Sequence, residues 1–196
     1  MHSPPEKVAA ILAENRLLRL RLQEVESELG RLVVRWSDVE AKNNMLANLY
    51  VAISQLHCTL GRPQVLEALS EIIIGLIGSE CFAVYERSDD GRVFRVAVSQ
   101  GVDDPRDLDL ESDPLARLLA AGQRSIAGSS DQVDLDMPVA VALPLRLDGC
   151  VTGGIVLFTL LAQKGELLDA DFELFDILEL HAAIALRSTA IGEVAA

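Results

Sequence analysis

An acidic run near the middle of the chain has the ligand spacing of a calcium-binding loop over its first three positions. Asp107, Asp109 and Glu111 alternate with other residues, as the first ligands of such a loop do. The pattern then fails, because Ser112 stands where the loop needs a glycine and Leu118 stands where it needs a bidentate carboxylate. We therefore interpret the run as a solvated acidic loop and predict no metal site.

Histidines and cysteines are the other candidates for chemistry. His57 and Cys58 adjoin near the end of the first predicted helix, on adjacent faces, and His181 lies within the last predicted helix. A metal site needs several converging ligands, so we interpret both histidines as packed or half-exposed side chains. A contact between His57 and His181 would make the packing of the two helices sensitive to pH.

Cys58, Cys81 and Cys150 are odd in number and form no CxxC or Cys/His metal spacing. We interpret them as buried thiols of a reducing, cytoplasmic compartment. Cys81 and Cys150 begin predicted strands, and the sequence offers no set of nucleophile, base and orienting group around them. We predict that the chain is not an enzyme and holds no cofactor.

The net charge of −13 resides in the globular part of the chain. Residues 1–42 carry seven acids and seven bases, which leaves 23 acids and 10 bases for residues 43–196. Nucleic acids and anionic membranes bind basic surfaces, so we predict neither as a partner. The N-terminus lacks the features of a signal peptide, and the longest apolar stretch, residues 150–162, is too short to span a bilayer.

A heptad repeat runs through the first third of the chain. Every seventh residue from Ile11 to Leu60 is aliphatic and occupies the d position. A stripe with 3–4 spacing kept this long is typical of a coiled coil. No proline interrupts it, so we predict one helix over residues 6–60, ended by Gly61 and Pro63.

The positions beside this stripe favour a parallel, in-register homodimer. Each g residue then faces the partner's e residue five places later, and no such pair carries like charges. Asn15 and Asn43 lie at a positions, where each finds a hydrogen-bonding partner in its own copy. Alternatively, Asn15 belongs to a frayed helix start and Asn43 to a bundle junction. The predicted dimerisation residues are Ile11, Asn15, Leu18, Leu22, Val25, Leu29, Leu32, Trp36, Val39, Asn43, Leu46, Tyr50 and Ile53.

From Met45 the apolar stripe widens to include Leu49 and Leu56, which is more than a two-helix seam needs. We predict that this stretch also contacts its own domain. The predicted domains are a coiled-coil arm over residues 1–44 and a globular domain over residues 45–196.

The globular part alternates helices with short strands. Asp148-Gly149 lies between two apolar runs and indicates a β-hairpin. Antiparallel strands with flanking helices make an α+β fold. We predict helices over residues 63–78, 115–121 and about 169–191, strands over 81–87, 92–99, 124–127, 139–147 and 151–159, and loops over 101–113 and 128–136.

Over about residues 45–191 this order resembles a GAF domain. Residues 115–126 (LARLLAAGQRSI) are similar to the family's short helix, glycine and following strand, and residues 141–157 (VALPLRLDGCVTGGIVL) to its central hairpin. The resemblance implies an antiparallel sheet of five or six strands, with the first and last helices packed on one face and often forming a dimer bundle. It implies a potential ligand pocket on the other face.

GAF domains bind cyclic nucleotides, tetrapyrroles, haem or small metabolites, and some have no known ligand. The NKxxF…DE pattern of the cyclic-nucleotide binders is absent, and no cysteine lies beside a histidine on the pocket side, so the ligand stays open. The predicted pocket-lining residues, for each of which plain core packing is the alternative, are Ala97, Ser99, Leu115, Leu118, Leu119 and Val141.

No output segment follows the last predicted helix in this sequence, so we expect the domain to act on a separate protein partner. We predict a homodimeric GAF-like regulatory or adaptor module in cytoplasmic signalling that acts through protein–protein contacts. The alternatives are a small-molecule sensor that relays ligand binding to the coiled coil, and an enzyme that uses Cys81 or Cys150.

Overall fold

The computed structural model describes residues 4–58, 61–127, 138–161, 167 and 169–194. It divides the chain into two compact units, one reaching to Leu46 and the other beginning at Ala47. The domain boundary predicted from the sequence lies two residues earlier. The loop predicted over residues 128–136 lies outside the described residues.

The first unit is helical along its described length. Helix α1 (Pro4–Cys58) has bounds within two residues of those predicted, and its residues from Ala47 belong to the second unit. Within the second unit, Leu49 and Leu56 are buried. This confirms that the stretch after Met45 packs against its own domain.

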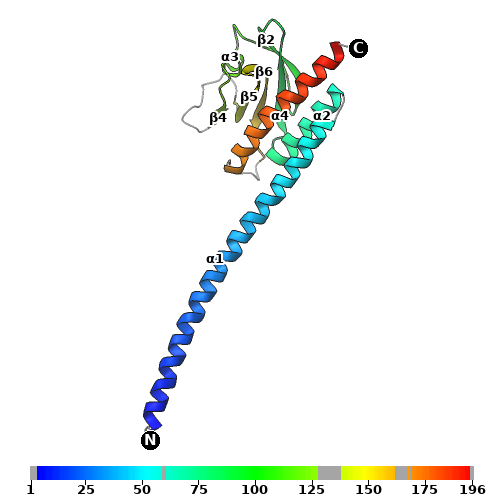
Figure 1. Ribbon diagram of the computed structural model, residues 1–196. Helices are drawn as coiled ribbons and strands as arrows, with labels where there is room; N and C mark the ends of the chain where they lie inside the picture. The colour runs from blue at the N-terminus through cyan, green and yellow to red at the C-terminus, as the bar shows by residue number, and fades with distance from the viewer. Residues whose placement is uncertain (1–3, 59–60, 128–137, 162–166, 168, 195–196) are drawn as a thin grey trace. The chain divides into compact units, whose positions relative to one another are not determined.

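The second unit is built on a six-stranded antiparallel sheet (Figure 1). The strand order is β3-β2-β1-β6-β5-β4, and every neighbouring pair is antiparallel. The predicted α+β fold is confirmed. The strands are β1 (Cys81–Arg87), β2 (Val93–Gln100), β3 (Leu108–Asp109), β4 (Ser125–Ile126), β5 (Val141–Leu147) and β6 (Cys150–Thr159).

Turns and bulges shape this sheet. Asp148 and Gly149 join β5 to β6 with φ values of 52° and 80°, as a two-residue type I′ turn requires. The pairing registers shift at three places, which leaves Ala97, Thr152 and Phe158 as extra residues opposite a continuous neighbouring strand.

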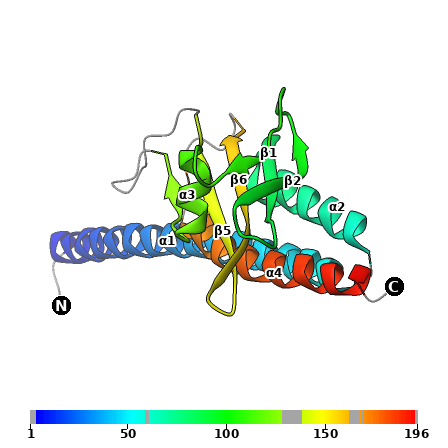
Figure 2. The same ribbon diagram turned by 90° about the horizontal axis from the view of Figure 1, so that it is seen from above.

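Helices cover both faces of the sheet (Figure 2). Helix α4 (Asp169–Val194) packs on β5 and on α2 (Arg62–Ile72), which continues into a π-helical turn, η1 (Ile73–Ile77). Helix α3 (Pro114–Ala120) contacts β5 and β6 from the other side. Asp113 caps α3 by accepting a hydrogen bond from the Leu115 backbone N–H at 2.8 Å.

Arg124, next to the edge strand β4, joins that edge of the sheet to α4. Its Nη2 donates to Asp176 Oδ1 at 2.6 Å, and its Nε donates to Glu179 Oε1 at 2.8 Å. Burial raises the pKa of Glu179, although the Arg124 guanidinium acts in the opposite direction. The arginine therefore offsets part of the cost of burying this carboxylate.

A glycine in β6 allows α3 to pack closely on the sheet. Gly154 pairs with Tyr85 and Pro144, and a Cβ atom at this position would lie 2.7 Å from Cδ2 of the fully buried Leu119. Any side chain here must displace Leu119 within a filled core.

We expect Gly154→Ala to lower the free energy of unfolding by about 1–3 kcal/mol through this overpacking. Gly75→Ala is the matched control, because a Cβ atom at Gly75 would meet no atom within 4 Å. Urea unfolding followed by circular dichroism measures both variants. Equal stability of the two variants would contradict the close packing of Leu119 on β6.

Candidate functional site

The face of the sheet under α3, where the sequence predicts a pocket, is filled by side chains. A continuous apolar cluster joins α3 to strands β1, β2, β3, β5 and β6. Phe94, Leu108, Leu115 and Leu119 within it are at most 1% exposed. Burial, followed by the charge of Asp113, raises the pKa of Tyr85 to about 12, so its hydroxyl stays protonated in this core.

The predicted pocket residues separate into three groups. The structure buries Leu115, Leu118 and Leu119 in this cluster, so these three leucines pack in the core and do not line an open pocket. Ser99 is half-buried and pairs with Ala83 of the cluster, whereas Ala97 is the half-buried extra residue of a bulge. Val141 was placed on the wrong face: its neighbour Ala142 points into the cluster, so Val141 points to the opposite side.

The acidic run forms local hydrogen bonds. Asp107 accepts from the Val96 N–H at 2.9 Å, and Asp109 accepts from the Glu111 N–H at 2.8 Å. In the described part of the chain, no three potential metal-ligating side chains gather. The residues around 107–111 therefore fix the course of the chain, and the short strand β3 lies within what the sequence predicts as loop.

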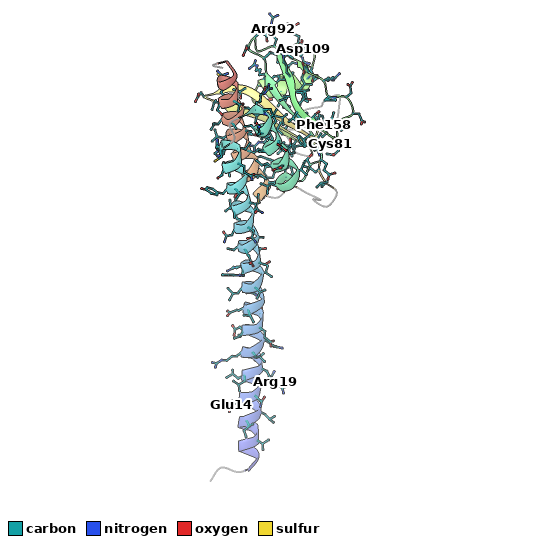
Figure 3. All side chains as sticks on the ribbon, turned by 90° about the vertical axis from the view of Figure 1, so that its right-hand side faces the viewer. Glu14, Arg19, Cys81, Arg92, Asp109 and Phe158 are labelled. Carbon is teal, nitrogen blue, oxygen red and sulfur yellow. The ribbon has the colours of Figure 1, made fainter. Side chains whose placement is uncertain are left out.

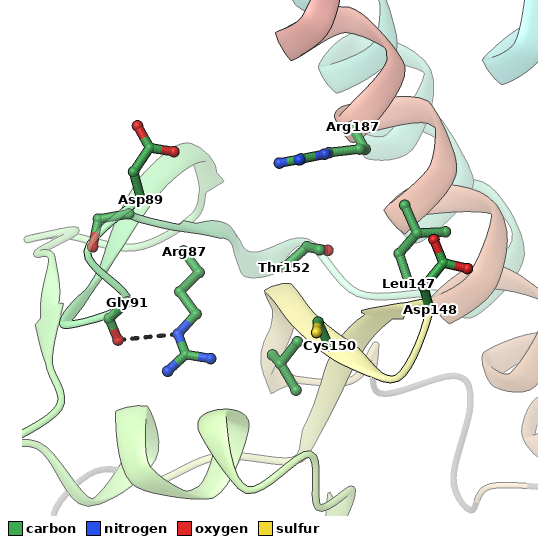
Figure 4. A pocket seen from close by; sticks show the side chains of 10 residues that line it. Arg87, Asp89, Gly91, Leu147, Asp148, Cys150, Thr152 and Arg187 are labelled. Carbon is green, nitrogen blue, oxygen red and sulfur yellow. Dashed lines mark hydrogen bonds between the residues drawn. The ribbon is translucent and has the colours of Figure 1, made fainter.

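A cleft of about 520 Å³ lies beside the turns β1–β2 and β5–β6 and against α4 (Figure 4). We call it the arginine cleft, after Arg87 and Arg187. The Arg87 Nε donates to the Gly91 carbonyl at 3.0 Å, and its guanidinium carbon lies 5.7 Å from the centre of the Phe94 ring. Arg187 extends from α4 above the cleft. The lining residues are Arg87, Ser88, Asp89, Gly91, Leu147, Asp148, Cys150, Val151, Thr152 and Arg187.

Sequence reasoning missed this cleft because its walls come from three distant segments. A β-bulge turns a side chain away from the regular alternation of a strand. The bulge at Thr152 is therefore one reason that the Thr152 side chain lines the arginine cleft. Two guanidinium groups and the carboxylates of Asp89 and Asp148 give the cleft both signs of charge. Such a lining suits a small zwitterionic molecule.

The cysteines differ from the sequence interpretation. All three are free thiols, but Cys58 and Cys150 are exposed and Cys81 is half-buried, so the prediction of buried thiols was wrong. Cys81 Sγ donates to the Gly101 carbonyl at 3.1 Å.

None of the helices that the structure describes is both long and apolar enough to cross a membrane.

The contact between His57 and His181 that the sequence analysis considers is present in the structure. Within the second unit, His57 Nε2 of α1 lies 2.7 Å from His181 Nδ1 of α4, as in a hydrogen bond between imidazoles. The ring centres are 5.0 Å apart, and the ring planes meet at 71°. Partial burial, followed by the nearby charge of His57, lowers the pKa of His181.

The a and d residues of α1 from Ile11 to Tyr50 form an exposed line that is apolar except at Asn15 and Asn43, and we call it the α1 seam. The aliphatic residues from Ile11 to Val39 are each more than half exposed, Trp36 is 73% exposed and Tyr50 is 74% exposed. Ile53, the last predicted dimerisation residue, is half-buried. Glu14 and Arg19, at g and e positions, lie on opposite flanks of the helix (Figure 3).

Comparison with known proteins supports the fold. A family model described as GAF domain matches residues 63–188. A GAF domain from a Coxiella burnetii phosphoenolpyruvate-protein phosphotransferase is 12% identical, with a TM-score of 0.61 over 78% of this chain and 98% of that one. The GAF domain of the Escherichia coli potassium sensor histidine kinase KdpD is 17% identical, with a TM-score of 0.57 over 75% and 96%.

A third similar structure is free methionine-R-sulfoxide reductase from Neisseria meningitidis with its substrate, 12% identical, with a TM-score of 0.55 over 74% of this chain and 89% of that one. At such identities the likeness concerns the fold alone. No curated protein matches the sequence of the chain.

The histidine pair predicts a dependence of stability on pH. Folding lowers the pKa of His181 below its ordinary value of 6.5. As pH falls through 6.5, the unfolded chain therefore binds more protons than the folded chain does. The stabilisation that a neutral His181 gives the folded chain is therefore complete above pH 6.5. It is lost as pH falls through the lowered pKa of His181. Urea unfolding at fixed protein concentration and several pH values measures it. His181→Gln should flatten the curve in this range, while His2→Gln, the control, should not; equal slopes would contradict the prediction.

Proposed function

The chain belongs to the GAF domain family, and we propose that it is a parallel homodimer that serves as a regulatory or adaptor module in signalling by binding a separate protein. The observation that carries the proposal is the α1 seam. Burial of one Val, Leu or Ile side chain contributes about 1.5–3 kcal/mol, and the seam leaves this contribution unused in a single chain. A single amphipathic helix is marginal in water without such packing.

Charges beside the seam favour a second copy of the same chain as its partner. In the parallel, in-register arrangement Glu14 faces Arg19, Arg21 faces Glu26 and Arg35 faces Glu40. Each exposed pair adds only a few tenths of a kcal/mol, so the pairs set direction and register while the aliphatic residues supply the affinity. Asn15 and Asn43, which are exposed on α1, gain hydrogen-bonding partners in the same register.

The filled face under α3 supports an adaptor over a ligand sensor at that face. A ligand there would have to displace Leu115, Leu118 and Leu119 from a packed cluster. We therefore assign the output to protein surfaces and assign no catalytic activity to the chain. The reducing, cytoplasmic compartment that the cysteines suggest remains part of this proposal.

The parallel register is tested by cysteine cross-linking in a variant whose three cysteines are replaced by serine. Val25→Cys, at a d position, should form an intermolecular disulfide under mild oxidation because d residues face their own copies. Ser27→Cys, on the outer side of the helix, is the matched control and should not. Light scattering should give twice the chain mass. A monomer at micromolar concentration, or equal cross-linking of both variants, would contradict the proposal.

The arginine cleft favours small-molecule sensing as a second candidate function. It is separate from the filled face, its size suits a small metabolite, and Arg187 of α4 would contact the bound molecule. A ligand held there would therefore bear directly on the last helix of the domain.

Thermal unfolding with free amino acids and dipeptides as probes tests this second function. A saturable rise in melting temperature is expected for a zwitterion that binds the folded state. Arg187→Gln should abolish the rise, whereas Arg117→Gln, an exposed arginine outside the cleft, should preserve it. Absence of any rise with the parent protein, or its persistence in Arg187→Gln, would oppose sensing at the cleft.

A further inference from the structure

The pair formed by His57 and His181 brings two imidazoles from different helices together at an accessible position. His57 is exposed and His181 is half-buried, and their facing nitrogen atoms are 2.7 Å apart. No group of three metal-ligating side chains occurs in the described residues of one chain. A closed site with four protein ligands at this pair therefore needs ligands from a second molecule.

The heptad register supplies those ligands. His57 lies seven residues after Tyr50 and continues the a positions of the repeat. In a parallel, in-register coiled coil, each a residue faces the same residue of the partner. His57 then faces His57 of the partner subunit, and each brings the His181 that it contacts in its own chain.

We propose that the dimer binds one divalent transition-metal ion, such as Zn²⁺, through four imidazoles: His57 and His181 of each chain. The site rests on the proposed parallel homodimer, because only that arrangement joins the two histidine pairs. Its class is a closed tetrahedral site that holds two subunits in register within the second unit, near the C-terminal end of α1.

The observed separation requires little change for metal binding. Zinc lies about 2.0–2.1 Å from each histidine nitrogen in tetrahedral geometry, so neighbouring ligand nitrogens are about 3.4 Å apart. The present 2.7 Å must increase by only about 0.7 Å. The ring that donates the hydrogen bond takes its other tautomer, with the proton on the nitrogen that faces away. Both facing nitrogens then present lone pairs, and a neutral pair releases no net proton.

Two further features suit a cation. Neutral imidazole is the form that binds metal, and a histidine with an ordinary pKa is mostly neutral at pH 7. The chain carries a net charge of −13, which draws divalent cations toward its surface. Imidazole nitrogen favours Zn²⁺, Cu²⁺, Co²⁺ and Ni²⁺ over Mg²⁺ and Ca²⁺, so the site should discriminate between these groups.

Titration of the chelator-treated, full-length protein with Co²⁺ tests the proposal. Tetrahedral cobalt gives an intense visible spectrum, which should saturate at one ion per two chains and disappear when Zn²⁺ is added. His57→Gln and His181→Gln should each abolish the spectrum. His2→Gln and Cys58→Ser are the controls and should preserve it, since His2 is the remaining histidine and Cys58 adjoins the pair.

Light scattering of the same metal-free sample separates this inference from the proposed function. A dimer that gives no tetrahedral spectrum, or one ion per chain, overturns the metal site and leaves the homodimer intact. Loss of the spectrum in Cys58→Ser also overturns the four-imidazole site. A chain that is monomeric with and without metal overturns both proposals.

Discussion

Burial of the central strands on both faces is the constraint that organises the second unit. Strands β1, β6 and β5 lie between α4 on one side and α3 on the other, and their middle residues are buried. Alternate residues of these strands therefore enter two different cores. The core under α3 is closed by leucines, and Gly154 lets one of them approach the sheet. Space for a small molecule is found at the turn end of the sheet, in the arginine cleft, whereas the face under α3 is occupied by the domain's own side chains.

The α1 seam differs from these two cores, because its aliphatic residues are exposed. Heptad spacing, the asparagines at a positions and the charges at g and e all agree with the partner that we propose: an identical helix, parallel and unstaggered. Agreement between independent features is what distinguishes a specified interface from a merely apolar surface. The buried Leu49 and Leu56 mark where the same helix begins to contact its own domain.

Much of this architecture could be predicted from the sequence, and the failures have physical reasons. The long helix and the β5–β6 hairpin carry strong local signals: a repeat of seven and an Asp-Gly turn. Strand β3 has only two residues, one of them an aspartate, so it carries no alternation that could reveal it. Val141 was assigned to the wrong face because β5 is apolar at successive positions, and a strand covered on both sides gives no sign of which residue faces which layer. The arginine cleft depends on three separated segments and a bulge, which only the folded chain brings together.

The double ion pair of Arg124 limits how α4 can move. Asp176 and Glu179 are three residues apart, so one arginine spans nearly a full helical turn at the edge of the sheet. A translation of α4 by one turn would shift both carboxylates by about 5.4 Å and separate them from the guanidinium. Any sliding of α4 along its own axis would therefore have to break both ion pairs beside β4.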